Sequence, residues 1–167
     1  SRHPAEINQL FYAISYSKGA SIIRMLEQFL VPEQFRKGLH RYLSAHAYDN
    51  ARGLDLWQAM EAESGQPVTS IMDSWVSQTG YPVIQADIRR EAGGVEAHLS
   101  QRRFVYRGAS RDPTVWQVPV RVTRSVGSQV DGMLLEHREG VLAVEQELVE
   151  GDGGDWLKLN PGQTGFY

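Results

Sequence analysis

Five histidines could supply ligands for a metal ion, but their spacing does not favour a metal site. None of them lies in an H-E-x-x-H motif, and no two are four residues apart, the spacing that places two ligands on one helix face. The chain has no cysteine, which excludes a thiolate zinc site, a disulfide and a cysteine nucleophile. We therefore expect this chain alone to bind no zinc. The histidines are His3, His40, His46, His98 and His137.

A second pattern has the spacing of a serine nucleophile. Ser15 and Lys18 form S-x-x-K, the nucleophile motif of penicillin-binding serine enzymes. Residues 48–50 (YDN) and 78–80 (QTG) are the nearest matches to the other two motifs of those enzymes. The third motif needs a cation to hold the substrate carboxylate, and Gln78 has no charge. That segment also closes a predicted helix, whereas the motif belongs on a strand, so we reject this interpretation.

The composition favours a folded protein without a nucleic-acid surface. Of 167 residues, 41% are hydrophobic and 22% are charged, which excludes an unfolded chain. Seventeen basic and twenty acidic residues give a net charge of −3, so there is no basic excess to bind phosphates. No apolar stretch approaches the ~20 residues that cross a bilayer, and residues 1–4 do not resemble a secretory leader. We expect neither nucleic acid nor membrane as a partner, and the absence of cysteine favours a cytoplasmic location.

The residue types change near Gly80, which predicts a change from helices to strands. Residues 1–80 hold three valines, eight alanines and five glycines, whereas residues 81–167 hold twelve, five and eleven. Alanine favours helices, valine favours strands and glycine favours turns. In the first half, apolar residues recur with helical spacing between prolines and glycines. The predicted helices cover residues 20–30, 32–43, 53–63 (ended by Gly65) and 67–80.

Short alternating segments predict strands in the second half. The clearest is residues 116–122, where Pro119 suggests an edge strand or a bulge. Six or seven short strands with glycine-rich turns favour an antiparallel β-sandwich. The predicted fold class is therefore α+β in two segregated units, an antiparallel helical bundle portion followed by a β-sandwich. The predicted strands are residues 82–88, 95–99, 116–122, 133–135, 141–144, 156–159 and 165–167.

Residues 13–21 (AISYSKGAS) resemble the I-S-Y-x-K-G-A segment of zinc aminopeptidases of the aminopeptidase N and puromycin-sensitive type. Residues 75–83 (WVSQTGYPV) resemble the W-x-x-Q-x-G-Y-P-V hinge of the same family. The resemblance covers essentially the whole chain, with its motifs in order. The other similar segments are residues 1–4 (SRHP), 35–43 (FRKGLHRYL), 55–57 (DLW), 101–104 (QRRF), 116–120 (WQVPV) and 159–167 (LNPGQTGFY).

This resemblance implies a place for the chain in a longer enzyme. Residues 1–80 would be the C-terminal helical part of a thermolysin-like catalytic domain, and residues 81–167 would be a β-sandwich domain. The family's G-x-M-E-N segment, its H-E-x-x-H helix and its glutamate zinc ligand would lie upstream, and a large helical domain downstream. The resemblance therefore implies zinc in the full-length enzyme, with ligands outside this chain, and the missing catalytic and C-terminal helical domains as partners.

Tyr16 is the one residue here that the resemblance identifies as catalytic. It stands at the position of the family's catalytic tyrosine. A phenol keeps its proton at neutral pH and can donate a hydrogen bond to the oxygen of the scissile carbonyl, where negative charge collects as water attacks. Without the resemblance, a buried or half-buried aromatic side chain at the start of a helix is the more ordinary interpretation.

The resemblance thus implies a fragment of a metal-dependent aminopeptidase that hydrolyses N-terminal residues from peptides, and we expect the fragment alone to be inactive. Two alternatives remain open: a non-catalytic binding or scaffolding β-sandwich module, and a relative of the family without zinc ligands.

Other residues in the matched segments have structural interpretations. We expect Lys18 to pack, to cap a helix or to help position the tyrosine, and Gly19 to permit close backbone approach. Ser15 and Ser17 are expected to cap the first helix. Four tryptophans are expected to anchor the core, namely Trp57, Trp75, Trp116 and Trp156.

Overall fold

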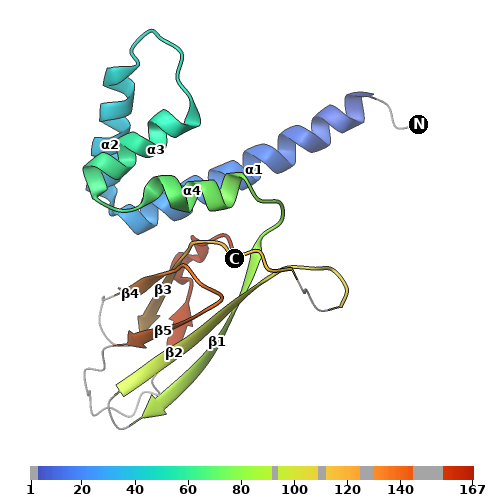
Figure 1. The fold of residues 1–167 in the computed structure, drawn as a ribbon, viewed down its shortest axis with the longest axis vertical. Helices are drawn as coiled ribbons and strands as arrows, with labels where there is room; N and C mark the ends of the chain where they lie inside the picture. Colours follow the sequence, from blue (N-terminus) through green and yellow to red (C-terminus); the bar gives the residue numbers. More distant parts are fainter. Residues whose placement is uncertain (1–3, 92–93, 109–111, 125–129, 145–155) are drawn as a thin grey trace.

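In the described part of the chain, the helices come first and the strands follow (Figure 1). The computed structural model describes residues 4–91, 94–108, 112–124, 130–144 and 156–167. This order confirms the predicted α+β class. The helices are α1 (Pro4–Leu30), α2 (Pro32–Ala45), α3 (Gly53–Ser64) and α4 (Val68–Val76). The strands are β1 (Pro82–Glu91), β2 (Gly94–Arg103), β3 (Val118–Arg124), β4 (Val130–Leu135), β5 (Glu139–Val144) and β6 (Leu157–Leu159), and a 3₁₀ helix spans Pro161–Gln163.

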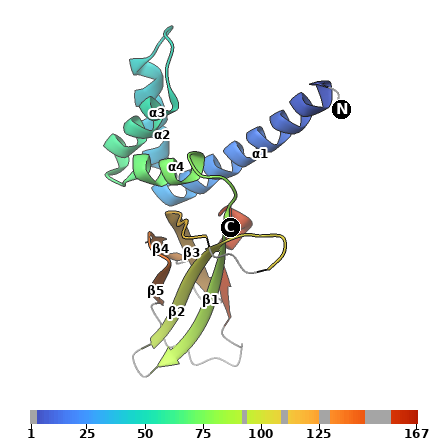
Figure 2. The ribbon, with the colours of Figure 1, turned by 45° about the vertical axis from the view of Figure 1, so that its right-hand side comes forward.

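The first helix is longer than its apolar stripe indicates. α1 begins at Pro4, whose fixed φ suits a first turn. Tyr16 therefore lies near the middle of α1, and the expectation that Ser15 and Ser17 cap its start is wrong. The buried stripe over residues 22–30 lies in the C-terminal half of α1. The other half projects beyond α4 in both views (Figures 1 and 2).

The predicted start of α2 and the predicted stop of α3 are confirmed, and α2 and α3 pack closely. Pro32 begins α2, and Gly65 ends α3 in the left-handed conformation (φ 66°). A Cβ atom added to Gly38 would lie 2.6 Å from the sulfur of Met60, so the glycine permits this helix contact. α4 ends at Val76, earlier than predicted, and residues 77–81 form a linker to β1.

Within the described residues, the strands form two antiparallel sheets, in the orders β1-β2-β5 and β4-β3-β6. Alternate side chains of β2 are buried from Val95 to Gln101. The valines of β3 that face them, Val118, Val120 and Val122, are at most 1% exposed and belong to the same hydrophobic cluster. The two sheets therefore share one core, as the predicted sandwich requires.

Pro119 lies in the middle strand of its sheet, where the sequence suggested an edge. β3 pairs with β4 over residues 118–123, but with β6 only over residues 122–124. At Pro119, β4 is thus the only paired neighbour within the described residues. One side of β3 at Pro119 is therefore not paired with a described strand, as at the edge of a sheet. This explains how the strand accommodates a residue without an N–H.

The last predicted strand does not form. Residues 165–167 follow the 3₁₀ helix without strand pairing in the described structure. Instead, the ring of Phe166 lies 6.1 Å from that of Trp75 and 5.7 Å from that of Tyr81, measured between centroids. The aromatic side chain of Phe166 therefore packs against the end of α4 and the linker.

Trp75 anchors the core, as the sequence predicted, and it also joins the helices to the strands. Its side chain is fully buried, its Nε1 donates to the carbonyl of Gln117 at 2.9 Å, and its ring centroid lies 6.4 Å from that of Trp116. Trp57 packs partly against the core, but Trp156 is 52% exposed, so a core role for Trp156 is wrong. Whether the two halves are separate domains stays a prediction.

Candidate functional site

Tyr16 lies on the face of α1 that points away from the core. Its side chain is 70% exposed, and Ile23, two turns further along the same face, is 41% exposed. On the opposite face Met25 is 3% exposed. The phenol of Tyr16 is therefore not a core side chain, and the packing interpretation from the sequence does not describe it.

Lys18 lies about 200° around α1 from Tyr16, at 3.6 residues per turn, and is half-buried. Its Nζ donates to the carbonyls of Gly80 at 3.3 Å and Gln78 at 3.5 Å, both in the linker after α4. Both acceptors lie beyond Val76, the last residue of α4, and beyond its C-cap Ser77. Lys18 therefore binds the linker rather than the last carbonyls of α4, and these contacts do not match the expected capping role.

Gly19 does not have the close contact that the sequence suggested. A Cβ atom added there would meet no atom of the described residues within 4 Å.

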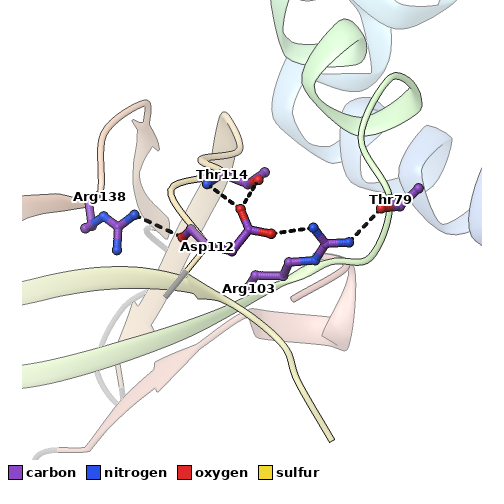
Figure 3. Close-up of polar contacts among 5 residues, drawn as sticks. All are labelled: Thr79, Arg103, Asp112, Thr114 and Arg138. Carbon is purple, nitrogen blue, oxygen red and sulfur yellow. Dashed lines mark hydrogen bonds and ion pairs between the residues drawn. The ribbon is translucent and has the colours of Figure 1, made fainter. Parts of the chain in front are cut away.

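The linker is held on its other side by a polar cluster of the strand region (Figure 3). At the end of β2, Arg103 donates from Nη2 to the hydroxyl of Thr79 at 2.6 Å and from Nη1 to the carboxylate of Asp112 at 2.5 Å. Asp112 also accepts from the backbone N–H of Thr114 at 2.9 Å and from the Thr114 hydroxyl. Arg138 donates to the main-chain carbonyl of Asp112 at 3.2 Å. We call Thr79, Arg103, Asp112 and Thr114 the junction rim.

The junction rim keeps its carboxylate charged. The hydroxyl of Thr114, then its backbone N–H, then the guanidinium of Arg103 lower the pKa of Asp112 from 3.8 to about 2. A group with this pKa has no proton to donate at neutral pH and is a weak base. The cluster therefore acts as a fixed ion pair and does not carry acid–base chemistry.

Gln101 makes a second polar contact, inside the sandwich. It is 3% exposed. Its Nε2 donates to the carbonyls of Trp116 and His137, each at 2.8 Å, and its Oε1 accepts from the N–H of Trp116 at 2.9 Å. The buried amide is therefore paired at both ends, as a buried polar group must be. We call Trp75, Gln101 and Trp116 the junction core.

The described histidines lie on separate elements. His40 is on α2, His46 follows it, His98 is on β2 with its Nε2 2.9 Å from the carboxylate of Glu96, and His137 lies between β4 and β5. Across the described residues, no group of three or more histidine, aspartate or glutamate side chains could hold a metal ion. This part of the chain therefore offers no ligand set that fits zinc.

The same ranges contain no helix that is both long enough and apolar enough to cross a membrane.

Comparison with known proteins shows which family and which relatives this chain resembles. Residues 1–75, which contain Tyr16 and end at Trp75, match the peptidase family M1 domain. Aminopeptidase M1 of Arabidopsis thaliana is 42% identical over 174 residues, which cover 99% of this chain and 19% of that protein. The helical half of the chain thus resembles the peptidase family M1 domain, and nearly its whole length resembles an aminopeptidase. The resemblance identified from the motifs is thereby confirmed.

Two other relatives align over a similar share of this chain and of their own length. The tricorn protease-interacting factor F2 of Thermoplasma volcanium is 40% identical over 99% of this chain and 19% of its own length. Glutamyl aminopeptidase of Rattus norvegicus is 37% identical over 98% of this chain and 17% of its own. The chain thus spans about a fifth of the length of the curated relatives it matches. The likeness includes the strands as well as the helices, because nearly the whole chain is aligned.

Proposed function

We propose that the full-length protein is a zinc-dependent aminopeptidase that removes N-terminal residues from peptides. The match of residues 1–75 to the peptidase family M1 domain supports this, as do relatives named aminopeptidases at 37–42% identity. Because the chain spans about a fifth of those relatives, the proposal concerns the longer protein. This chain alone is expected to be inactive.

Tyr16 is the residue in this chain that we expect to act on the substrate. The observation that supports this most directly is its exposure of 70% in the middle of a helix whose opposite face is buried. A rigid helix that presents a phenol outward suits a hydrogen bond to a developing oxyanion, because the donor is positioned before the reaction begins. Phenylalanine would fill the same volume but could not donate.

The zinc ion that this family implies would polarise the attacking water. Its ligands are expected outside this chain, and the contribution of Tyr16 does not depend on which residues they are. The remaining catalytic and C-terminal helical regions are the expected partners of this chain. Apolar side chains that are exposed in the helical half of the chain suit such contacts, namely Ile23 (41%), Val31 (57%), Leu43 (58%) and Leu54 (49%).

The experiment is Tyr16→Phe in the full-length enzyme, assayed with a panel of aminoacyl 4-nitroanilides. Loss of one oxyanion donor typically costs ~10²–10³ in kcat, and we expect that range with KM nearly unchanged. Zinc content and thermal midpoint should match the parent, because the ring remains and the phenol is not expected to bind the metal.

The matched control is Tyr48→Phe, which removes the same hydroxyl from a fully exposed tyrosine between α2 and α3. It should leave kcat unchanged. A Tyr16→Phe enzyme that keeps more than about half of the parental kcat would show that Tyr16 is not the oxyanion donor. A parent protein that binds peptides without hydrolysing them would favour the scaffolding alternative.

A further inference from the structure

Lys18 lies on the same face of α1 as its buried stripe. It lies one turn before Ile22 on the same face, and Ile22 and Met25 are each 3% exposed. Towards the N-terminus of Lys18, α1 projects beyond α4 (Figures 1 and 2). Lys18 is thus placed between the packed half of α1 and the projecting half, two residues after Tyr16.

The acceptors of Lys18 are themselves held by the strand region. The side chain of Gln78 donates to the carbonyl of Ser74 at 2.8 Å and to that of Val115 at 3.2 Å. Thr79 accepts from Arg103 of the junction rim at 2.6 Å. The carbonyls that face Lys18 therefore belong to a linker fixed at both sides.

The distances from Lys18 to these carbonyls, 3.3 and 3.5 Å, are long for neutral hydrogen bonds. Their strength comes from a full positive charge next to the two carbonyl dipoles of the linker. An arginine could keep this attraction, whereas an uncharged side chain of similar length could not.

We propose that Lys18 is a positioning residue for Tyr16. Its ammonium fixes α1 to the linker from the inner face, and the same helix presents the phenol from the outer face. Loss of the charge would let the projecting half of α1 shift relative to the body, and the hydroxyl would meet the oxyanion less well. This inference rests on the catalytic role proposed for Tyr16.

The test is a double-mutant cycle in the full-length enzyme, with Tyr16→Phe, Lys18→Met and the double variant. Since a 1 Å displacement of a catalytic group can cost ~10²-fold, we expect Lys18→Met to lower kcat about 10-fold, with KM within about 2-fold. Lys18→Arg should restore most of kcat. In the Tyr16→Phe background, Lys18→Met should change kcat by less than about 2-fold, because coupled residues are not additive.

Lys158→Met is the matched control, since it makes the same substitution at an exposed lysine of β6. It should leave kcat and KM unchanged. Circular dichroism and the thermal midpoint establish that each variant folds, and Lys18→Gln replaces Lys18→Met in the cycle if the latter does not.

The outcomes separate this inference from the proposed function. An active Tyr16→Phe enzyme would overturn the role of Tyr16, and the role of Lys18 with it. An impaired Tyr16→Phe enzyme whose Lys18→Met counterpart keeps full kcat would overturn the inference about Lys18 alone. Equal losses from Lys18→Met in both backgrounds would overturn it too, because they would show that Lys18 acts independently of the phenol.

Discussion

The junction core and the junction rim join the same two halves of the chain by different means. In the junction core, Trp75 is fully buried, Gln101 is 3% exposed, and the hydrogen bonds of both side chains join neutral groups. In the junction rim, the side chains of Arg103 and Asp112 are 27% and 30% exposed and carry full charges. Both sets connect α4 or its linker to the strands.

The difference predicts different roles. Burial makes a neutral contact costly to break, because each lost partner leaves a desolvated group or a cavity. A half-exposed ion pair is screened by water and contributes less to stability, but its geometry is specific. The junction core should therefore decide whether the halves hold together, and the junction rim should decide how the linker is placed.

The largest effect is expected for Trp75→Ala. Removal of a fully buried tryptophan costs about 3–5 kcal/mol in unfolding free energy, and the indole donor to Gln117 is lost as well. Urea unfolding followed by circular dichroism measures it. Trp156→Ala is the control, because Trp156 is 52% exposed and should cost less than ~1 kcal/mol. A similar loss of unfolding free energy in both variants would show that Trp75 does not hold the two halves together.

Gln101→Leu should have the next largest effect. Leucine fills a similar volume but leaves the buried N–H of Trp116 without its acceptor, and an unpaired buried group costs ~1–3 kcal/mol. We expect about 2–3 kcal/mol, by the same urea unfolding measurement. Gln85→Leu makes the identical change at an exposed position of β1 and should be nearly neutral. A stable Gln101→Leu chain would mean that the amide is not needed to join the sheets.

Gln101 also shows where prediction from sequence ends. The alternation of β2 predicted residues 95–99, but the strand continues to Arg103, and its last buried position is polar. The acceptors that make this burial possible are Trp116 and His137, which lie 15 and 36 residues away. No local pattern encodes such partners. Strand existence was predictable from valine alternation, whereas the role of a buried glutamine required the fold.

In the candidate site, too, some features were predictable from local sequence and others required the fold. The motif around Tyr16 led to the family that residues 1–75 match, but the apolar spacing placed Tyr16 at a helix start, whereas α1 begins at Pro4. Its outward orientation could not be read from the stripe. Lys18 lies 62 residues from Gly80, one of its acceptors, so its contact with the linker was visible only in three dimensions.

Gly80→Ala should have a smaller effect and tests the rim from the linker side. Gly80 has a φ of 84°, and an added Cβ atom would lie 3.1 Å from Nε of Arg103. A left-handed residue with a side chain costs roughly 1–2 kcal/mol, and the arginine must also move. Thermal and urea unfolding should both show the loss.

Gly19→Ala is the control with the opposite sign. An added Cβ atom there meets no described atom within 4 Å, and alanine is preferred over glycine inside a helix by about 1 kcal/mol. Destabilisation at Gly19 comparable to that at Gly80 would show that the linker geometry is not the cause.

The smallest effect should be the pH dependence that the junction rim gives to stability. The pKa of Asp112 is lowered to about 2 by the Thr114 hydroxyl, the Thr114 N–H and Arg103, from an ordinary 3.8. A carboxyl whose pKa is lower in the folded state binds protons less readily there than in the unfolded chain. Its contribution is therefore complete above about pH 4 and is lost as the pH falls towards 2.

Asp112→Asn should accordingly lower the thermal midpoint slightly at neutral pH, and the difference from the parent should shrink between pH 4 and pH 2. Because the Thr114 hydroxyl is the largest cause of the low pKa, Thr114→Val should raise the pKa of Asp112 more than Arg103→Gln does. Titration of the Asp112 carboxyl carbon by NMR measures both shifts. A larger rise in Arg103→Gln would mean that the ion pair, and not the threonine turn, holds the carboxylate in the junction rim.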